Sequence, residues 1–123
     1  MPNALNWFEI PVKDLARATK FYETILGVSL QQYDGMGMKS AFFPVDFENG
    51  SVGGCIIEGE GYEPSTSGAL IYLACGPDLS VALSKVEDAG GKVLLPKTSI
   101  GEHGFMAYFL DTEGNKMALH SDK

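Results

Sequence analysis

The sequence predicts an α+β domain built from two consecutive βαβββ units. Two segments with the same helical pattern lie 64 residues apart, at 14–27 and 78–91. Each is preceded by one short apolar segment typical of a strand and followed by three more. A pattern that recurs at a constant offset indicates a duplicated unit. With 123 residues, the chain is expected to be a single domain, with units at about 1–58 and 69–123 and a linker at 59–68.

The first unit begins with a strand over 7–12 and a helix over 14–27. Asp14 is a typical N-cap residue, and Gly27 is a typical stop. Between them an apolar face recurs at helical spacing. The residues of this face are Leu15, Ala18, Phe21, Tyr22, Ile25 and Leu26. Three further strands are expected, at 28–33, 39–45 and 52–58.

The second unit repeats this order, with a strand over 70–75 and a helix over 78–91. The two helical segments share five of 14 residues, including the Asp that opens each and the Gly that closes each. Strands are then expected at 92–95, 105–110 and 116–121. The segment between the units, GEGYEPSTSG, is polar and rich in glycine, as linkers are.

Composition excludes several classes of partner. Nine Lys and Arg against 16 Asp and Glu give a net charge of −7, which disfavours nucleic acids and anionic membranes. No apolar stretch approaches the roughly 20 residues that span a bilayer, and residues 1–9 lack the features of a secretion signal. A cytoplasmic location is therefore expected. The two cysteines, Cys55 and Cys75, form no CxxC pair and are expected to be reduced.

Strand alternation predicts which side chains share a face. In the first strand, Phe8, Ile10 and Val12 are apolar and suit the helix side, so Trp7 and Glu9 point the opposite way. The same alternation places Tyr72 and His120 on the face away from the second helix. If the helices cover only one side, the free face can bind a ligand. Its expected ligand-binding residues are Trp7, Glu9, Tyr72, His120 and Cys55.

Three of these side chains could also act as catalysts. A carboxylate half-buried beside Trp7 would have a raised pKa, as a general base requires, and His120 could titrate near neutral pH. Tyr72 could donate to a developing oxyanion, so Glu9, His120 and Tyr72 suit proton abstraction next to a carbonyl. Alternatively, Glu9 is solvated or ion-paired at a pocket rim, and a backbone carbonyl satisfies His120.

The centres of two equivalent strands carry large aromatic residues. Phe42 and Tyr108 are expected in the core, with the alternative that one of them lines the pocket.

Several motifs together resemble the vicinal oxygen chelate superfamily, which includes glyoxalase I, extradiol dioxygenases, and fosfomycin- and bleomycin-resistance proteins. They are IPVKDL at 10–15 leading into Phe21-Tyr22 and Leu26-Gly27, then AGGKV at 89–93 and FLDTEGN at 109–115. The resemblance implies that the two βαβββ units form an eight-stranded, incompletely closed curved sheet with the helices on its outside. It also implies a homodimer.

The resemblance further implies where a metal would bind in relatives that use one. These relatives draw His ligands from first strands and Glu ligands from last strands. The corresponding positions here are Trp7, Leu70 and Ala118, with the fourth near Gly53. None of these side chains coordinates a divalent cation, so no metal and no cofactor is expected. Glu9 and His120 alone would make a weak displaced site.

The expected function is therefore that of a glyoxalase- or bleomycin-resistance-like protein that binds a small organic molecule in a metal-free concave pocket. The alternative is a glyoxalase-related lyase or isomerase that uses Glu9 as general base, with or without a displaced metal.

Overall fold

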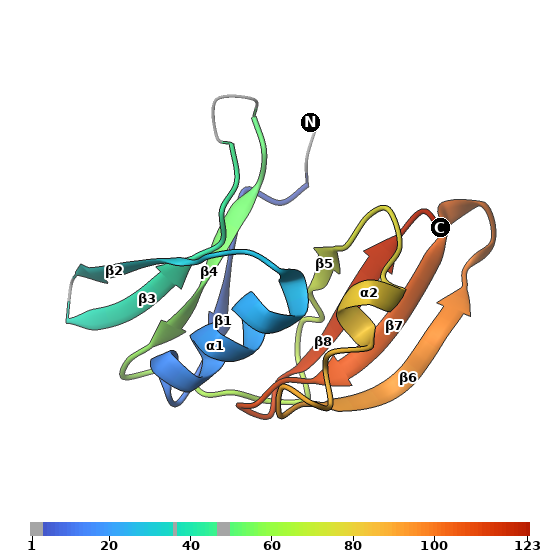
Figure 1. Ribbon diagram of the computed structural model, residues 1–123. Helices are drawn as coiled ribbons and strands as arrows, with labels where there is room; N and C mark the ends of the chain where they lie inside the picture. Colours follow the sequence, from blue (N-terminus) through green and yellow to red (C-terminus); the bar gives the residue numbers. More distant parts are fainter. Residues whose placement is uncertain (1–3, 36, 47–49) are drawn as a thin grey trace.

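The computed structural model describes residues 4–35, 37–46 and 50–123, which form two four-stranded sheets of the same topology. The sheets are not closed into a barrel (Figure 1). The first has the order β1-β4-β3-β2 and consists of β1 (Trp7–Pro11), β2 (Gln31–Gly35), β3 (Met38–Phe42) and β4 (Gly53–Glu58). The second has the order β5-β8-β7-β6 and consists of β5 (Tyr72–Ala74), β6 (Lys92–Ser99), β7 (Phe105–Leu110) and β8 (Lys116–Ser121). The α+β class and the repeated strand order are confirmed.

In each sheet the first and last strands of the unit run parallel. β1 pairs with β4 so that Trp7 lies opposite Gly53, and β5 pairs with β8 so that Tyr72 lies opposite Ala118. The remaining pairs are antiparallel. As a result β1 and β5 are edge strands, and Figure 1 shows them at the neighbouring edges of two sheets that lie side by side.

The first helix, α1, spans Leu15–Leu26 and has the predicted caps. The Asp14 carboxylate accepts the backbone N–H of Arg17 at 3.1 Å. Gly27 adopts a left-handed conformation with a φ of 67°, which a residue without a Cβ tolerates, and its N–H bonds to the Glu23 carbonyl. The helix therefore begins and ends where the sequence predicts.

The second helix is much shorter than predicted. α2 spans only Ser80–Leu83, and the prediction of a helix over 78–91 is wrong for most of its length. Beyond it, the N–H groups of Lys85 and Val86 bond to carbonyls three residues back, which is the tighter turn geometry. Gly91 then lies so close to β7 that a Cβ would sit 2.5 Å from the Leu110 carbonyl oxygen. The α-helix therefore ends at Leu83, and the chain continues in tighter turns toward Gly91.

One hydrophobic cluster combines the helix-facing sides of both sheets. Both helices lie in front of the sheets in Figure 1, and the alternation predicted for β1, β5 and β8 is confirmed. The buried helix-facing residues of these strands and of the loop after β1 include Ile10, Val12, Leu73, Met117 and Leu119. Within the described ranges, no helix is long and apolar enough to cross a membrane.

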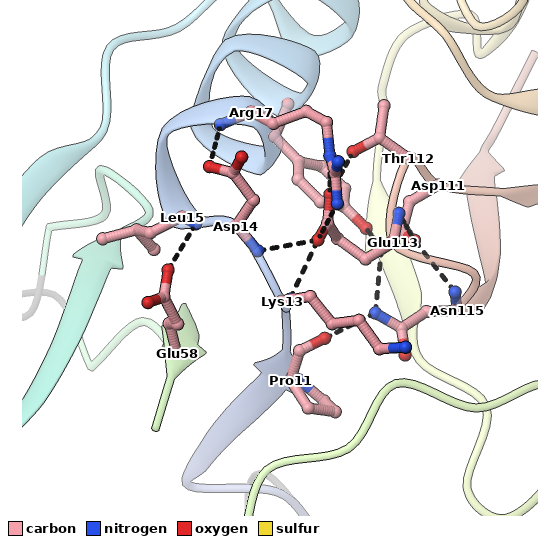
Figure 2. Close-up of polar contacts among 11 residues, drawn as sticks. Pro11, Lys13, Asp14, Leu15, Arg17, Glu58, Asp111, Thr112, Glu113 and Asn115 are labelled. Carbon is pink, nitrogen blue, oxygen red and sulfur yellow. Dashed lines mark hydrogen bonds and ion pairs between the residues drawn. The ribbon is translucent and has the colours of Figure 1, made fainter. Parts of the chain in front are cut away.

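A carboxylate from the second unit binds the start of α1, as Figure 2 shows. Glu113, in the turn between β7 and β8, accepts the backbone N–H groups of Lys13 and Asp14 at 2.8 and 2.9 Å. The guanidinium of Arg17 donates to both oxygens of Glu113, at 2.7 and 2.9 Å. Burial raises the pKa of Glu113, but these hydrogen bonds and one from Thr112 outweigh it and hold the pKa at about 2. The contact fixes α1 against the second unit.

A second carboxylate in the same turn is fully buried. Asp111 accepts the hydroxyl of Tyr22 at 2.7 Å and the side-chain amide of Asn115 at 3.0 Å. The same amide donates to the carbonyl of Pro11 at 2.7 Å, next to the end of β1. Burial, followed by the charge of Asp111 and its hydrogen bond, raises the pKa of Tyr22 well above its ordinary value. Together these bonds position β1 and α1 relative to β5 and β8.

Candidate functional site

A groove of about 1070 Å³ lies along the neighbouring edges of β1 and β5. Its walls come from β1, from β5 and its flanking residues, from the end of α1 and from α2. Most of the lining side chains are apolar, and they include Phe8, Ile25, Leu26, Phe43, Leu73 and Val81. The charged residues that line it within the described ranges are Glu9, Asp78 and Lys85. Binding sites for small molecules have this mixture of apolar walls and few polar groups.

Glu9 lies at the rim of this groove and is held by two neutral donors. The Tyr62 hydroxyl donates to one carboxylate oxygen at 2.9 Å, and the Trp7 indole N–H donates to the other at 3.4 Å. The bond to Glu9, followed by burial, raises the pKa of Tyr62. Glu9 itself is exposed, so the half-buried carboxylate expected from the sequence is not found. The alternative of a position at the rim is the correct one.

Trp7 and Cys55 lie beside Glu9, outside the lining of the groove. The Trp7 ring packs edge-on against Phe42, with ring centroids 5.1 Å apart. Cys55 lies opposite Glu9 in the β1–β4 register and is 1% exposed. Burial, with a smaller contribution from the Glu9 charge, raises the pKa of the Cys55 thiol to about 11. Cys55 is therefore protonated at neutral pH and is a poor nucleophile.

Tyr72 lines the groove from the β5 side and is 48% exposed. Its hydroxyl lies 3.3 Å from the hydroxyl of Tyr108, and this hydrogen bond raises the pKa of Tyr72. The ammonium of Lys116 lies 4.5 Å from the centre of the Tyr108 ring. A phenol and a neighbouring cation thus lie on the second sheet, where Tyr72 lines the groove and Tyr108 and Lys116 do not.

His120 does not join the other predicted site residues. Its Nε2 atom lies 2.7 Å from the backbone carbonyl of His103, so the alternative of a histidine satisfied by the backbone is confirmed. Glu9, Tyr72 and His120 each bond to a different partner. The structure therefore brings Glu9 and Tyr72 to one groove but shows no direct hydrogen bond among the predicted catalytic trio.

Two aromatic residues and one linker residue contact the predicted site residues, although none of the three lines the groove. Phe42 and Tyr108 are half-buried on the faces away from the helices, so the expectation of core positions is wrong for both. Each contacts a predicted site residue, since Phe42 packs on Trp7 and Tyr108 bonds to Tyr72. Tyr62 lies in the linker, where no periodicity marks a functional side chain, and for this reason sequence reasoning missed it.

The positions at which metal-using relatives carry ligands hold no suitable set here. Trp7 lies opposite Gly53, and Ala118 lies opposite Tyr72. In the repeat Glu9 aligns with Tyr72; Cys55 lies opposite Glu9, and Ala118 lies opposite Tyr72. The counterpart of Ala118 in the first unit is therefore Cys55 rather than Gly53. In the described part of the chain, no three His, Cys, Asp or Glu side chains gather closely enough to hold a metal ion. The residues present do not fit a divalent cation.

Comparison with known proteins finds one matching family. The model of the Glyoxalase/Bleomycin resistance protein/Dioxygenase superfamily matches residues 4–119. No curated protein matches the sequence.

Solved structures of similar fold include a glyoxalase/bleomycin resistance protein from Albidiferax ferrireducens, with a TM-score of 0.76, 17% identity and coverage of 98% of this chain and 100% of that chain. A fosfomycin resistance protein from Listeria monocytogenes has a TM-score of 0.67, 20% identity and coverage of 100% and 96%. A mutant of glyoxalase I from Zea mays has a TM-score of 0.70 and 23% identity, with coverage of 98% of this chain but 47% of that chain. At such identities the likeness concerns the fold.

Proposed function

Because the chain belongs to the Glyoxalase/Bleomycin resistance protein/Dioxygenase superfamily, we propose that it binds a small organic molecule in the groove between β1 and β5. The observation that carries this proposal is the groove itself, which has about 1070 Å³ of space and a mainly apolar lining. Glu9 and Tyr72 supply polar groups from opposite walls. Trp7 holds Glu9 in place. The proposal needs no contact from Cys55 or His120, which do not line the groove.

The proposed binding does not depend on a metal ion. This part of the proposal is supported by the side chains at the family's ligand positions, where Trp7, Leu70 and Ala118 offer no donor. It is also supported by the fourth position, where the single buried thiol of Cys55 has none of the further ligands that a divalent cation needs at the other three positions. Thermal unfolding with Zn²⁺, Ni²⁺ and Mn²⁺ at sub-millimolar concentration is expected to show no stabilisation. A large shift with any one ion would contradict metal-free binding, because ligands of the native state stabilise it by mass action.

The groove itself can be tested with a neutral fluorescent probe, N-phenyl-1-naphthylamine. Val81 and Leu94 are both exposed apolar residues, with 62% and 43% of their surface accessible, but only Val81 lines the groove. Val81→Glu is expected to weaken probe binding at least tenfold, because a charge in an apolar site must be desolvated. Leu94→Glu, the matched control, is expected to leave it unchanged. Equal effects of the two substitutions, or no probe binding by the parent protein, would refute the proposed site.

A second candidate function is a lyase or isomerase reaction in which Glu9 removes a proton. The observation that favours it is the hydrogen bond between Tyr62 and Glu9, which places a phenol donor next to a potential base. Glu9→Gln distinguishes the two functions. In an enzyme of this kind, the substitution abolishes turnover of a carbonyl substrate while the ligand still binds, whereas a binding protein shows no turnover before or after it.

We also propose that the chain forms a homodimer in a reducing compartment, the cytoplasm. Tyr33 in β2 and Leu94 in β6 are exposed apolar residues that do not line the groove, and these two strands form the outer edges of the two sheets. Such surfaces favour association. Both cysteines are free thiols, which suits a reducing compartment. Sedimentation equilibrium at micromolar concentration is expected to give twice the chain mass of 13.2 kDa, and a monomer would contradict this part of the proposal.

A further inference from the structure

The charges that line the groove differ in how far they are neutralised. Asp78 forms an ion pair with Lys97 at 3.0 Å and accepts the backbone N–H of Ser80 at 2.8 Å. Glu9 has no ion pair with any residue in the described ranges. Its two hydrogen bonds come from the hydroxyl of Tyr62 and the indole of Trp7, which carry no charge. The negative charge of Glu9 is therefore oriented by its neighbours but not compensated by them.

The Glu9 carboxylate also retains acceptor capacity toward the groove. An ionised carboxylate has about four acceptor sites, and each oxygen of Glu9 uses one of them. Because the two donors bind different oxygens, the carboxylate cannot rotate freely. A ligand donor would thus meet a fixed pair of oxygens, and less rotamer entropy is lost on binding than with a mobile surface carboxylate.

Aromatic rings surround this carboxylate on its protein side. The Trp7 and Tyr62 rings reach Glu9 by their polar edges, and Phe42 packs against Trp7 at 5.1 Å. Ring edges carry positive potential, so these rings orient the carboxylate of Glu9 without neutralising its charge. A positive group paired with Glu9 therefore gains from the carboxylate itself. The opposing charge in the groove, Lys85, is an exposed side chain that solvent screens.

We propose that the ligand of the groove is an organic cation, an amine or quaternary ammonium group joined to an apolar body, with Glu9 as its counter-ion. This inference rests on the proposed function, namely that the groove binds a small molecule. The ammonium group would lie at Glu9 between β1 and the linker. The apolar body would lie against Tyr72 and Ala74, which line the groove on the same face as Glu9. The net charge of −7 adds a long-range attraction for such a ligand.

The test uses three probes with the same phenylpropyl body: 3-phenylpropylammonium, 3-phenylpropanol and 3-phenylpropanoate. Their affinities are measured by displacement of N-phenyl-1-naphthylamine, and quenching of Trp7, the single tryptophan of the chain, reports proximity to Glu9. The cation is expected to bind about fivefold to tenfold more tightly than the alcohol, which is the range of a partly exposed ion pair. The anion is expected to bind most weakly. The preference for the cation should decrease as salt is raised.

Two variants test whether Glu9 causes the preference for the cation over the alcohol. Glu9→Gln is expected to abolish the preference, so that cation and alcohol bind equally. Asp88→Asn, the matched control, removes one negative charge at an exposed position away from the groove and is expected to keep the preference. Circular dichroism confirms that both variants fold.

The outcomes separate this inference from the proposed function. Equal binding of cation and alcohol by the parent protein, tightest binding of the anion, or an unchanged preference in Glu9→Gln would overturn the cationic ligand alone. Failure of the naphthylamine probe to bind at all would overturn the proposed function, and the inference with it.

Discussion

The contact between Glu113 and the start of α1 is expected to stabilise the fold, and the lowered pKa of Glu113 gives the size of this contribution to the free energy of unfolding. The Glu113 side chain has 0% of its surface exposed, and its pKa lies at about 2 instead of its ordinary 4.5. A difference of this size corresponds to roughly 3 kcal/mol of stability above pH 4.5. Because Arg17, its charged partner, is 51% exposed, solvent screening reduces the expected value to about 2 kcal/mol.

The direction of the pH dependence follows from the sign of the shift. A lowered pKa means that the native state favours the ionised carboxylate, so this stabilisation is complete above pH 4.5 and is lost as the pH falls toward 2. Glu113→Gln is expected to lower the free energy of unfolding by about 2 kcal/mol at pH 7. Below pH 3 the difference between the two proteins should become much smaller.

Urea unfolding of both proteins between pH 7 and pH 2.5 measures this difference. Glu60→Gln is the matched control, because Glu60 is exposed, and its free energy of unfolding is expected to stay within about 0.5 kcal/mol of the parent value. The reasoning is refuted if Glu113→Gln is as stable as the parent at pH 7, or if its deficit is unchanged at pH 2.5. The second result would point to packing rather than charge.

Two further predictions concern buried polar groups. Tyr22→Phe removes the hydroxyl that donates to Asp111 at 2.7 Å and leaves Asn115 as the remaining donor to that buried oxygen. The free energy of unfolding, measured by heat and urea, is therefore expected to fall by about 1–3 kcal/mol. A decrease below about 0.5 kcal/mol would contradict this role of the hydroxyl. Burial raises the pKa of both Cys55 and Cys75 to about 11, so alkylation by iodoacetamide at pH 8 should be far slower in the native protein than in urea, and equal rates in both states would show that the thiols are accessible.

The sequence predicts the elements whose ends carry explicit signals. α1 has Asp14 and Gly27 at its ends, and the structure places it between them. The sequence predicts a strand over 92–95 that ends before Pro96, but β6 continues to Ser99. Its pairing with β7 shifts register on either side of Leu95, and such irregularities accommodate a proline within a strand. Irregular pairing of this kind depends on the partner strand and has no local signal.

For the candidate site, alternation correctly separated the two faces of β1 and β5. It placed Glu9 and Tyr72 away from the helix side, and both line the groove. The groove is also lined by the helix-facing Phe8 and Leu73 and by residues of α1 and α2, so it is not confined to the free face where the ligand was expected. Alternation cannot reveal contacts that depend on the path of a loop. These include the hydrogen bond from Tyr62 to Glu9 and the hydrogen bond that the backbone carbonyl of His103 accepts from the His120 ring. The early end of α2 also depends on tertiary packing, namely on the close approach of Gly91 to Leu110, and therefore has no local signal in the sequence.

Because Glu113 lies in the second half of the duplication and bonds to the first, the first half does not contain all the hydrogen-bond partners of its own helix start. The peptide groups of Lys13 and Asp14 in the first half obtain their acceptor from the second half. If the chain were cut in the linker, the isolated first fragment would begin its helix with these groups open to water and with Arg17 lacking its carboxylate. In the other direction, the buried carboxylate of Asp111 in the second half accepts the hydroxyl of Tyr22 from the first. Each half of the repeat thus supplies a hydrogen-bond partner to the other.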